Sequence, residues 1–192
     1  AGDLKASIIA VASQLLVDGG IEAVTMRSIA SKLDVSRGAP YRHFEGKHDL
    51  LCSVAQSSFE LLNNSMLNLS SKEGEPKGEL FQLAHKYIDF CLSHPELYNL
   101  IFNNAELSNN QTIELSNAAF KLFHQLETLL TKFQQAGVIQ KEDVNLQANF
   151  VWSSLHGYCC LLQTQGAKKV EKLVMNQEFF LEKIWGALLT NR

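Results

Sequence analysis

The sequence is poor in the residues that interrupt helices. Its 192 residues include only 3 prolines and 11 glycines, and these gather in a few places along the chain. A sandwich or barrel of many short strands needs turn residues about every 8–12 positions. The chain lacks that spacing, so a many-stranded fold is excluded and long helices are expected.

The sequence also lacks a continuous apolar run of membrane-spanning length. Ser13 and Gln14 interrupt the apolar stretch 8–16, and the first residues carry no basic flank of the kind that precedes a secretion signal. A membrane-spanning helix needs about 20 predominantly apolar residues. We therefore expect a cytoplasmic protein that does not cross a membrane.

Motifs for metal, redox or catalytic chemistry are missing as well. The 4 cysteines form no Cys-x-x-Cys pair, and the Cys91-x-x-His94 spacing has no second pair to complete a metal site. Cys159 and Cys160 have no basic neighbour in sequence that would activate a thiol. No paired nucleophile and base and no phosphate loop occur. We expect no catalytic residue, no metal and no cofactor, and not an enzyme.

Apolar residues instead recur at the three- and four-residue spacing of amphipathic helices, and no segment alternates as a strand would. An all-α fold of about nine helices is predicted. The expected helices span residues 4–19, 26–33, 37–44, 47–69, 79–92, 95–102, 112–133, 143–163 and 175–189.

The most informative segment is 25–51. Thr25 and Ser36 are placed to cap two short helices, 26–33 and 37–44, with a tight turn at Asp34-Val35. Two short helices across such a turn predict a helix-turn-helix. Residues 25–44 carry a net charge of +3 while the whole chain carries −3, so the remainder carries −6. A basic head on an acidic body is suited to approach phosphate.

These residues closely resemble the TetR family of bacterial transcriptional regulators. The resemblance rests on segments 25–30 and 35–44, on Lys47 and on Leu50-Leu51, and it covers roughly residues 4–51. A second, shorter resemblance, at 94–98 and at Trp152 with His156-Gly157, is to the subgroup with a Trp-His-Gly signature in its C-terminal domain.

The resemblance implies a homodimer that offers two recognition helices to a palindromic operator in double-stranded DNA. It divides the chain into a DNA-binding domain, 1–46, and a ligand-binding and dimerisation domain, 47–192. The implied DNA-binding residues are Thr25, Arg27, Ser36, Arg37, Gly38, Ala39, Tyr41, Arg42, His43 and Lys47. Relatives often carry a basic arm ahead of the first helix, whereas this sequence has only Lys5 there.

The body is expected to hold a small-molecule effector and to form the dimer. The ligand candidates are Phe59, Tyr98, Phe102, Phe123, Trp152 and His156, which serve equally well as core packing. The last two helices, 143–163 and 175–189, carry enough apolar residues for a four-helix dimer interface. Their apolar residues are Phe150, Val151, Leu155, Leu161, Leu162, Phe179, Phe180, Ile184, Trp185 and Leu188.

The resulting functional hypothesis is a ligand-responsive repressor that a hydrophobic effector releases from DNA, through a shift of the long helix beginning at Lys47. The alternative is a dimeric small-molecule-binding helical protein without specific DNA recognition.

Overall fold

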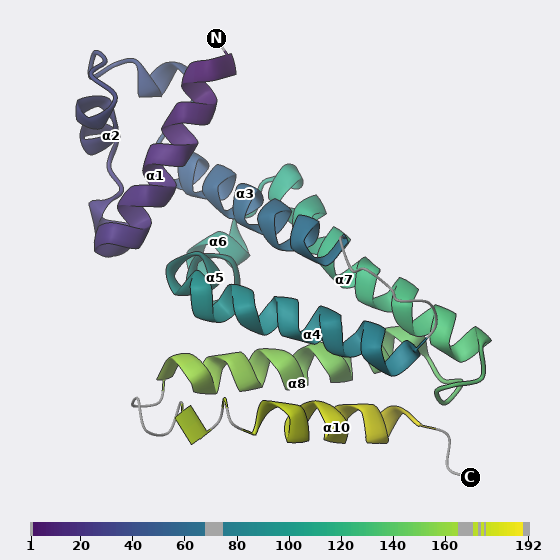
Figure 1. Ribbon diagram of the computed structural model, residues 1–192. Helices are drawn as coiled ribbons and strands as arrows, with labels where there is room; N and C mark the ends of the chain where they lie inside the picture. The colour runs from purple at the N-terminus through teal and green to yellow at the C-terminus, as the bar shows by residue number, and fades with distance from the viewer. Residues whose placement is uncertain (1, 68–74, 165–170, 173, 175, 190–192) are drawn as a thin grey trace. The chain divides into compact units, whose positions relative to one another are not determined.

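The computed structural model describes residues 2–67, 75–164, 171, 172, 174 and 176–189. Figure 1 shows the helices that these residues form. They are α1 (Gly2–Ala23), α2 (Met26–Lys32), the 3-10 helix η1 (Pro40–Arg42), α3 (Lys47–Leu67), α4 (Pro76–Ser93), α5 (Pro95–Phe102), α6 (Ala105–Asn109), α7 (Ile113–Gln135), α8 (Val144–Thr164) and α10 (Gln177–Leu188). No strand occurs in the described ranges beyond an isolated bridge between Ile139 and Leu189. The all-α prediction is confirmed.

The chain divides into two compact units. The first comprises Ala1–Leu61 and His94–Ala119, and the second comprises Leu62–Ser93 and Phe120–Arg192. The expected boundary between residues 46 and 47 is a boundary of function, and it stays a prediction. The whole helix-turn-helix segment lies within the first unit.

In the first unit, α1 packs against α2 and α5, α2 packs against η1, and α5 packs against α6. Ile8, Ala12 and Leu16 form the buried face of α1, and Met26 and Ile29 belong to the buried face of α2. Burial of these side chains removes apolar surface from water and holds the short α2 in place, since an isolated helix of this length is unstable.

The segment Leu4–Ala23 of α1 has a mean hydropathy of 1.4 and is long enough to cross a membrane. Its buried face, which includes Ile8 and Leu16, packs inside the first unit. The core helix of a globular protein has the same length and composition as a short span. We therefore assign α1 as a core helix of the first unit.

In the second unit, α4, α8 and α10 lie side by side (Figure 1). Phe133 of α7 meets the Trp185 ring edge to face at 6.2 Å, and Tyr158 stacks on Phe180 at 4.5 Å. Several residues expected at a dimer interface are instead buried within this unit. They are Val151, Leu155, Leu162, Ile184, Trp185 and Leu188.

Outside the segment 25–44, two elements differ from the sequence-based expectation beyond small shifts at helix ends. The short helix α6 was not expected; Asn104 begins it by accepting a hydrogen bond from the Leu107 amide at 3.0 Å. The first helix was expected to end at Gly19, but the left-handed backbone lies at Gly20 (φ 72°). Residues 68–69 and Met175, expected at helix termini, lie outside the described residues.

Candidate functional site

The predicted cap at Thr25 is present and fixes the start of α2. The Thr25 hydroxyl accepts a hydrogen bond from the Ser28 amide at 3.0 Å, and the Ser28 hydroxyl accepts one from the Thr25 amide at 3.1 Å. This reciprocal capping box satisfies amide groups that have no partner inside the helix. The first helix of the motif therefore begins at a defined residue.

The end of α2 is equally defined. Asp34 adopts a left-handed backbone conformation with φ 51°. The Val35 amide donates to the Ala30 carbonyl at 3.0 Å and the Asp34 amide donates to the Ser31 carbonyl at 3.3 Å. This pair of bonds is the Schellman motif, which ends a helix and turns the chain sharply. The tight turn predicted at Asp34-Val35 is therefore present.

The second helix of the motif is shorter than predicted. Residues 37–44 were expected to form a helix capped by Ser36, but only Pro40–Arg42 are helical, as a 3-10 turn that begins after Ala39 without a side-chain cap. Pro40 has no amide hydrogen to donate to the Ser36 carbonyl, which instead accepts from the Ala39 amide at 2.9 Å. The missing donor explains the tighter turn.

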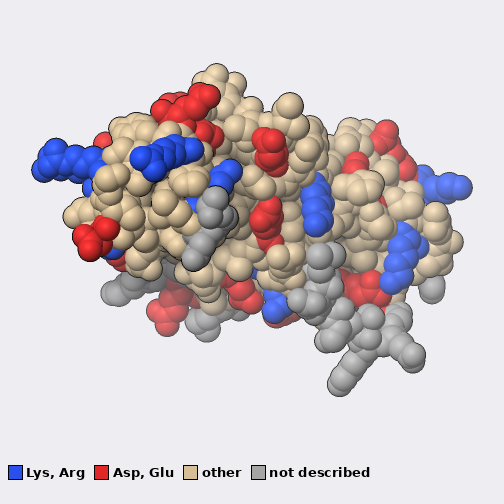
Figure 2. All heavy atoms as spheres, turned by 90° about the horizontal axis from the view of Figure 1, so that it is seen from above, with Lys and Arg blue, Asp and Glu red and all other residues tan. Residues whose placement is uncertain are grey.

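The recognition segment, residues 36–43, presents its polar side chains outward. Arg37, Gly38 and Arg42 are exposed, and Tyr41 is 59% exposed although it is aromatic. Ala39 is the exception among the predicted contact residues, because its side chain is only 8% exposed. Ala39 can therefore take part only through its backbone. In Figure 2, Lys and Arg side chains project at the end of the head that contains α2.

The residues expected to contact phosphate differ in their exposure and in their existing side-chain interactions. Arg27 and Ser36 are exposed, His43 is half-buried, and Thr25 is exposed with its hydroxyl engaged in the capping box. The Lys47 ammonium, in the first turn of α3, lies 3.9 Å from the Glu22 carboxylate. Such an exposed ion pair is weak and exchanges readily for a stronger anion.

Lys5, a basic residue in the first turn of α1, does not extend away from the first unit. Its ammonium lies over the Phe44 ring, 5.5 Å from the ring centre. Phe44 itself is buried behind the recognition segment, at 2% exposed. A cation over an aromatic face is attracted by the partial negative charge that the ring quadrupole places there. Lys5 thus supports the core of the head.

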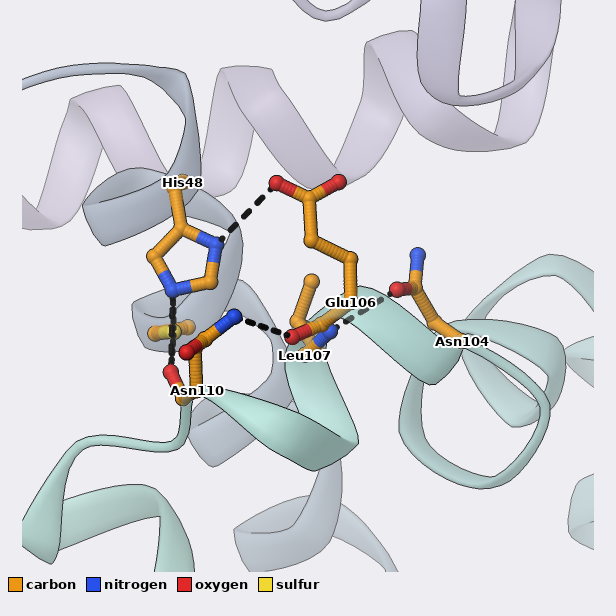
Figure 3. Close-up of polar contacts among 6 residues, drawn as sticks. His48, Asn104, Glu106, Leu107 and Asn110 are labelled. Atoms are coloured by element: carbon orange, nitrogen blue, oxygen red, sulfur yellow. Dashed lines mark hydrogen bonds and ion pairs between the residues drawn. The ribbon is translucent and has the colours of Figure 1, made fainter.

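A polar cluster ties the first turn of α3 to α6 (Figure 3). The His48 ring binds the Asn110 carbonyl through Nε2 at 2.9 Å, and its Nδ1 lies 3.6 Å from the Glu106 carboxylate. The buried Cys52 thiol lies 3.5 Å from the same Nε2, and burial raises the pKa of this thiol. The helix that follows the recognition segment is thereby anchored within the first unit.

The second unit contains a narrow apolar cavity that is partly open to solvent. Its free volume, taken as the space open to the centre of a water molecule, is about 30 Å³, which is room for about two waters. The lining residues are Met66, Leu83, Tyr87, Leu122, Phe123, Leu126, Trp152 and Leu155. Phe123 and Trp152, whose rings lie 5.2 Å apart, were predicted here.

Four of the predicted ligand residues do not line this cavity. Phe59, Tyr98 and Phe102 lie in the first unit, where their rings pack on one another at 5.5 and 4.8 Å. His156 lies beside the cavity and contacts the Tyr87 hydroxyl at 3.4 Å. The lining residues that were not predicted are Tyr87 and several leucine and methionine side chains. They recur along their helices at the same spacing as ordinary core residues. Sequence reasoning could not single them out.

The cavity's polar neighbours are largely neutral. Burial lowers the pKa of His156, which favours the uncharged ring. Its Nε2 lies 3.5 Å from the Cys160 thiol, and burial raises the pKa of that thiol. Within the described ranges, no group of three or more His, Cys, Asp or Glu side chains is arranged to hold a metal ion.

Comparison with known proteins gives two family matches. Residues 8–54 match the profile of bacterial regulatory proteins of the tetR family, and residues 80–177, about half of the chain, match the tetracyclin repressor-like C-terminal domain. The first match spans the whole recognition segment, and the second spans α4 to α8. Neither match separates the Trp-His-Gly subgroup, which stays a prediction.

Individual relatives agree. The chain is 22% identical over 185 residues to the uncharacterized HTH-type transcriptional regulator YobS of Bacillus subtilis, covering 96% of this chain and 92% of that protein. A Rhodococcus sp. RHA1 protein of unknown function has the same fold, with a TM-score of 0.82 at 24% identity over 97% of this chain and 96% of that one. A TetR-family transcriptional regulator of Pectobacterium atrosepticum gives 0.75 at 18% identity over 100% and 97%.

The family matches and the local geometry identify the same residues as a helix-turn-helix. The capped α2, the Schellman turn and the exposed basic segment form a helix-turn-helix, and the matched profile covers those same residues. The chain therefore belongs to the TetR family of bacterial regulatory proteins, as a DNA-binding transcriptional regulator of the helix-turn-helix type.

Proposed function

We propose that the protein is a homodimeric repressor that binds a palindromic operator in the cytoplasm and leaves it when a small hydrophobic effector binds. The observation that carries this proposal is the exposed, positively charged recognition segment that follows a rigid turn. Arg37, Tyr41 and Arg42 would reach base edges and adjacent phosphates in the major groove.

Gly38 supports close contact with DNA. A Cβ atom built on this residue would meet no protein atom within 4 Å, and its φ angle is not in the left-handed region. Neither packing nor backbone conformation within the chain therefore requires glycine here. The absence of a side chain at the exposed surface would let the recognition backbone approach the floor of the groove.

Phosphate contacts would set the register of the head on DNA. Arg27 and Ser36 are free to reach them, and Lys47 would exchange its distant Glu22 partner for a phosphate at the N-terminus of α3. Thr25 and His43 would add hydrogen bonds from either side of the segment. Because each basic contact releases counterions, affinity should fall steeply with salt.

The proposed dimer interface lies on α8 and α10. Phe150 and Leu161 of α8 are 45% and 47% exposed, and Phe179 of α10 is 65% exposed. The exposed Gly157 lies between the first two at helical spacing, so the α8 surface is flat in the middle and apolar on both sides. Two copies of such a surface can pack closely as a four-helix bundle.

The cavity suggests how an effector would act. With room for about two waters, it cannot hold a ligand unless its walls move. Met66 is one wall, and it belongs to α3, which begins at Lys47 directly after the recognition segment. A ligand that displaces Met66 would shift α3 and the spacing of the two heads. A coupling of about 1–3 kcal/mol would be typical.

The test is binding of the full-length protein to DNA from upstream of its own gene, measured by fluorescence anisotropy. Arg37→Ala and Tyr41→Ala should each weaken specific binding about tenfold or more, since a good base contact is worth about 1–3 kcal/mol. Lys86→Ala, on the exposed surface of α4, is the control for loss of one positive charge.

Size-exclusion chromatography should give the same dimer for all three variants. Unchanged affinity of both recognition variants for a palindrome that the parent protein binds would remove the assignment of this segment. Equal affinity of the parent protein for unrelated DNA would instead favour a binding protein without specific recognition.

A further inference from the structure

The cavity in the second unit is apolar on almost all of its surface. Six of its eight lining side chains are alkyl, thioether or phenyl groups, while Tyr87 adds a hydroxyl and Trp152 an indole N–H. None of the lining side chains carries a charge. A charged group placed against these side chains would lose its hydration without gaining a counter-charge, which is costly.

The polar end of the cavity offers a hydrogen bond but no cation. The Tyr87 hydroxyl lies 3.4 Å from His156 Nδ1, and His156 Nε2 lies 3.5 Å from the Cys160 thiol. Burial lowers the pKa of His156, so the ring is neutral near pH 7.

From the lining and its polar end together, we infer that this cavity takes uncharged, mostly hydrocarbon molecules with a single hydrogen-bonding group at the Tyr87 end, and rejects carboxylates. The effector class is then a small phenol, alcohol, ketone or ester, and not a free fatty or aromatic acid. This inference rests on the proposed function only in treating the cavity as the effector site.

A matched pair of probes tests the selectivity. 4-Propylphenol and 4-propylbenzoate have the same ring and alkyl chain, but at pH 7.5 the phenol is neutral and the benzoate is ionised, since such groups have pKa values of about 10 and 4. Binding to the full-length protein is measured by quenching of tryptophan fluorescence and by calorimetry. We expect the phenol to bind at least tenfold more tightly.

Two variants locate the binding. Tyr87→Phe keeps the ring and removes the hydroxyl, so it should weaken 4-propylphenol several-fold and leave propylbenzene, which has no polar group, unchanged. Leu83→Phe fills the cavity and should abolish binding of the phenol, with the helix content checked by circular dichroism. Equal affinity for phenol and benzoate, or no binding of either, would overturn the inference. Full binding to Leu83→Phe would do so as well.

Release of operator DNA separates this inference from the proposed function. If 4-propylphenol binds selectively in the cavity but leaves operator affinity unchanged, the selectivity stands and the cavity's role as an effector site is refuted. If the phenol also releases DNA, both statements are supported.

Discussion

Asp34 is the residue that sets the direction in which the chain leaves α2. It holds a left-handed backbone conformation, and the two hydrogen bonds of the Schellman motif depend on it. This conformation has a higher energy for residues with a Cβ atom. The penalty is smaller for Asn and Asp, and glycine has none. Its carboxylate is also the acidic group of the basic segment 25–44.

Replacing Asp34 should therefore separate backbone strain from charge. Asp34→Ala should lower the free energy of unfolding by roughly 1 kcal/mol, because alanine adopts the left-handed conformation less readily than aspartate does. Asp34→Gly and Asp34→Asn should retain stability or increase it. Urea unfolding followed by circular dichroism measures the stability of all three variants. An alanine variant as stable as the asparagine variant would show that backbone strain at position 34 does not limit stability.

Gly38 gives a second prediction at this scale. Gly38→Leu should leave the thermal midpoint within the range of the parent protein, because the new side chain enters open space. It should reduce operator affinity by at least tenfold, because the same side chain would hold the backbone away from the groove. Gly78→Leu, a glycine of α4 whose nearest neighbour is at an ordinary 3.8 Å, is the control. Intact DNA binding by Gly38→Leu would refute close approach.

Capping and the turn could be predicted from sequence because both depend on residues three to five positions apart. The Thr25 cap and the Asp34-Val35 turn follow from local hydrogen bonds. Ser36 was assigned as a cap for the same reason, but the missing amide of Pro40 removed the helix that it would have capped. Pro40 thus accounts for the 3-10 turn in place of the expected α-helix.

At the scale of elements, apolar spacing located the long helices to within a few residues. It did not reveal α6, whose five residues contain one buried side chain, Leu107, too few to establish a period. That short helix has a function in the fold, since Glu106 and Asn110 receive the His48 ring from the first turn of α3 (Figure 3).

The outer surface of α8 gives the prediction at this scale. Gly157→Leu should stabilise the isolated subunit, since a helix-interior glycine costs up to about 1 kcal/mol relative to a good helix former and the new side chain meets no atom within 4 Å. It should also separate the proposed dimer, because the side chain would stand between the two α8 helices of the proposed interface. Light scattering after size-exclusion chromatography gives the mass, with Gly78→Leu as the control. A Gly157→Leu dimer of unchanged affinity would place the interface elsewhere.

For the whole molecule, the sequence predicted the architecture but not which helices enclose a cavity. Phe59, Tyr98 and Phe102 are residue types that commonly line ligand pockets. In the structure their rings pack on one another in the first unit. Spacing along a helix shows which residues share a face, while the partner of that face depends on contacts between distant segments. The same reason applies to the ten residues expected at a dimer interface. Six of them are buried within their own unit, and their spacing did not reveal this.

Stability against acid is a property of the whole molecule that His156 should influence. Burial lowers the pKa of His156 below its ordinary value of 6.5 in the folded protein. As the pH falls below 6.5, the unfolded chain takes up a proton that the folded protein resists, so stability is lost on the acid side and kept above it. His156→Gln should reduce this loss in thermal melts between pH 7.5 and 5.

His124→Gln is the matched control, because this histidine is exposed on α7 and lies 3.3 Å from Glu127. Its substitution shows how much the pH profile changes when an exposed histidine is removed. An identical pH profile for parent and His156→Gln would show that the buried ring does not contribute.

The near absence of free space beside Trp152 has a practical consequence for any search for the proposed effector. Virtual screening that fits candidates into the resting shape would discard any compound that binds there, because each is larger than the free volume before the walls move. Ranking a compound library by its effect on melting temperature avoids that error, since heat-induced unfolding reports the adapted complex and not the closed receptor.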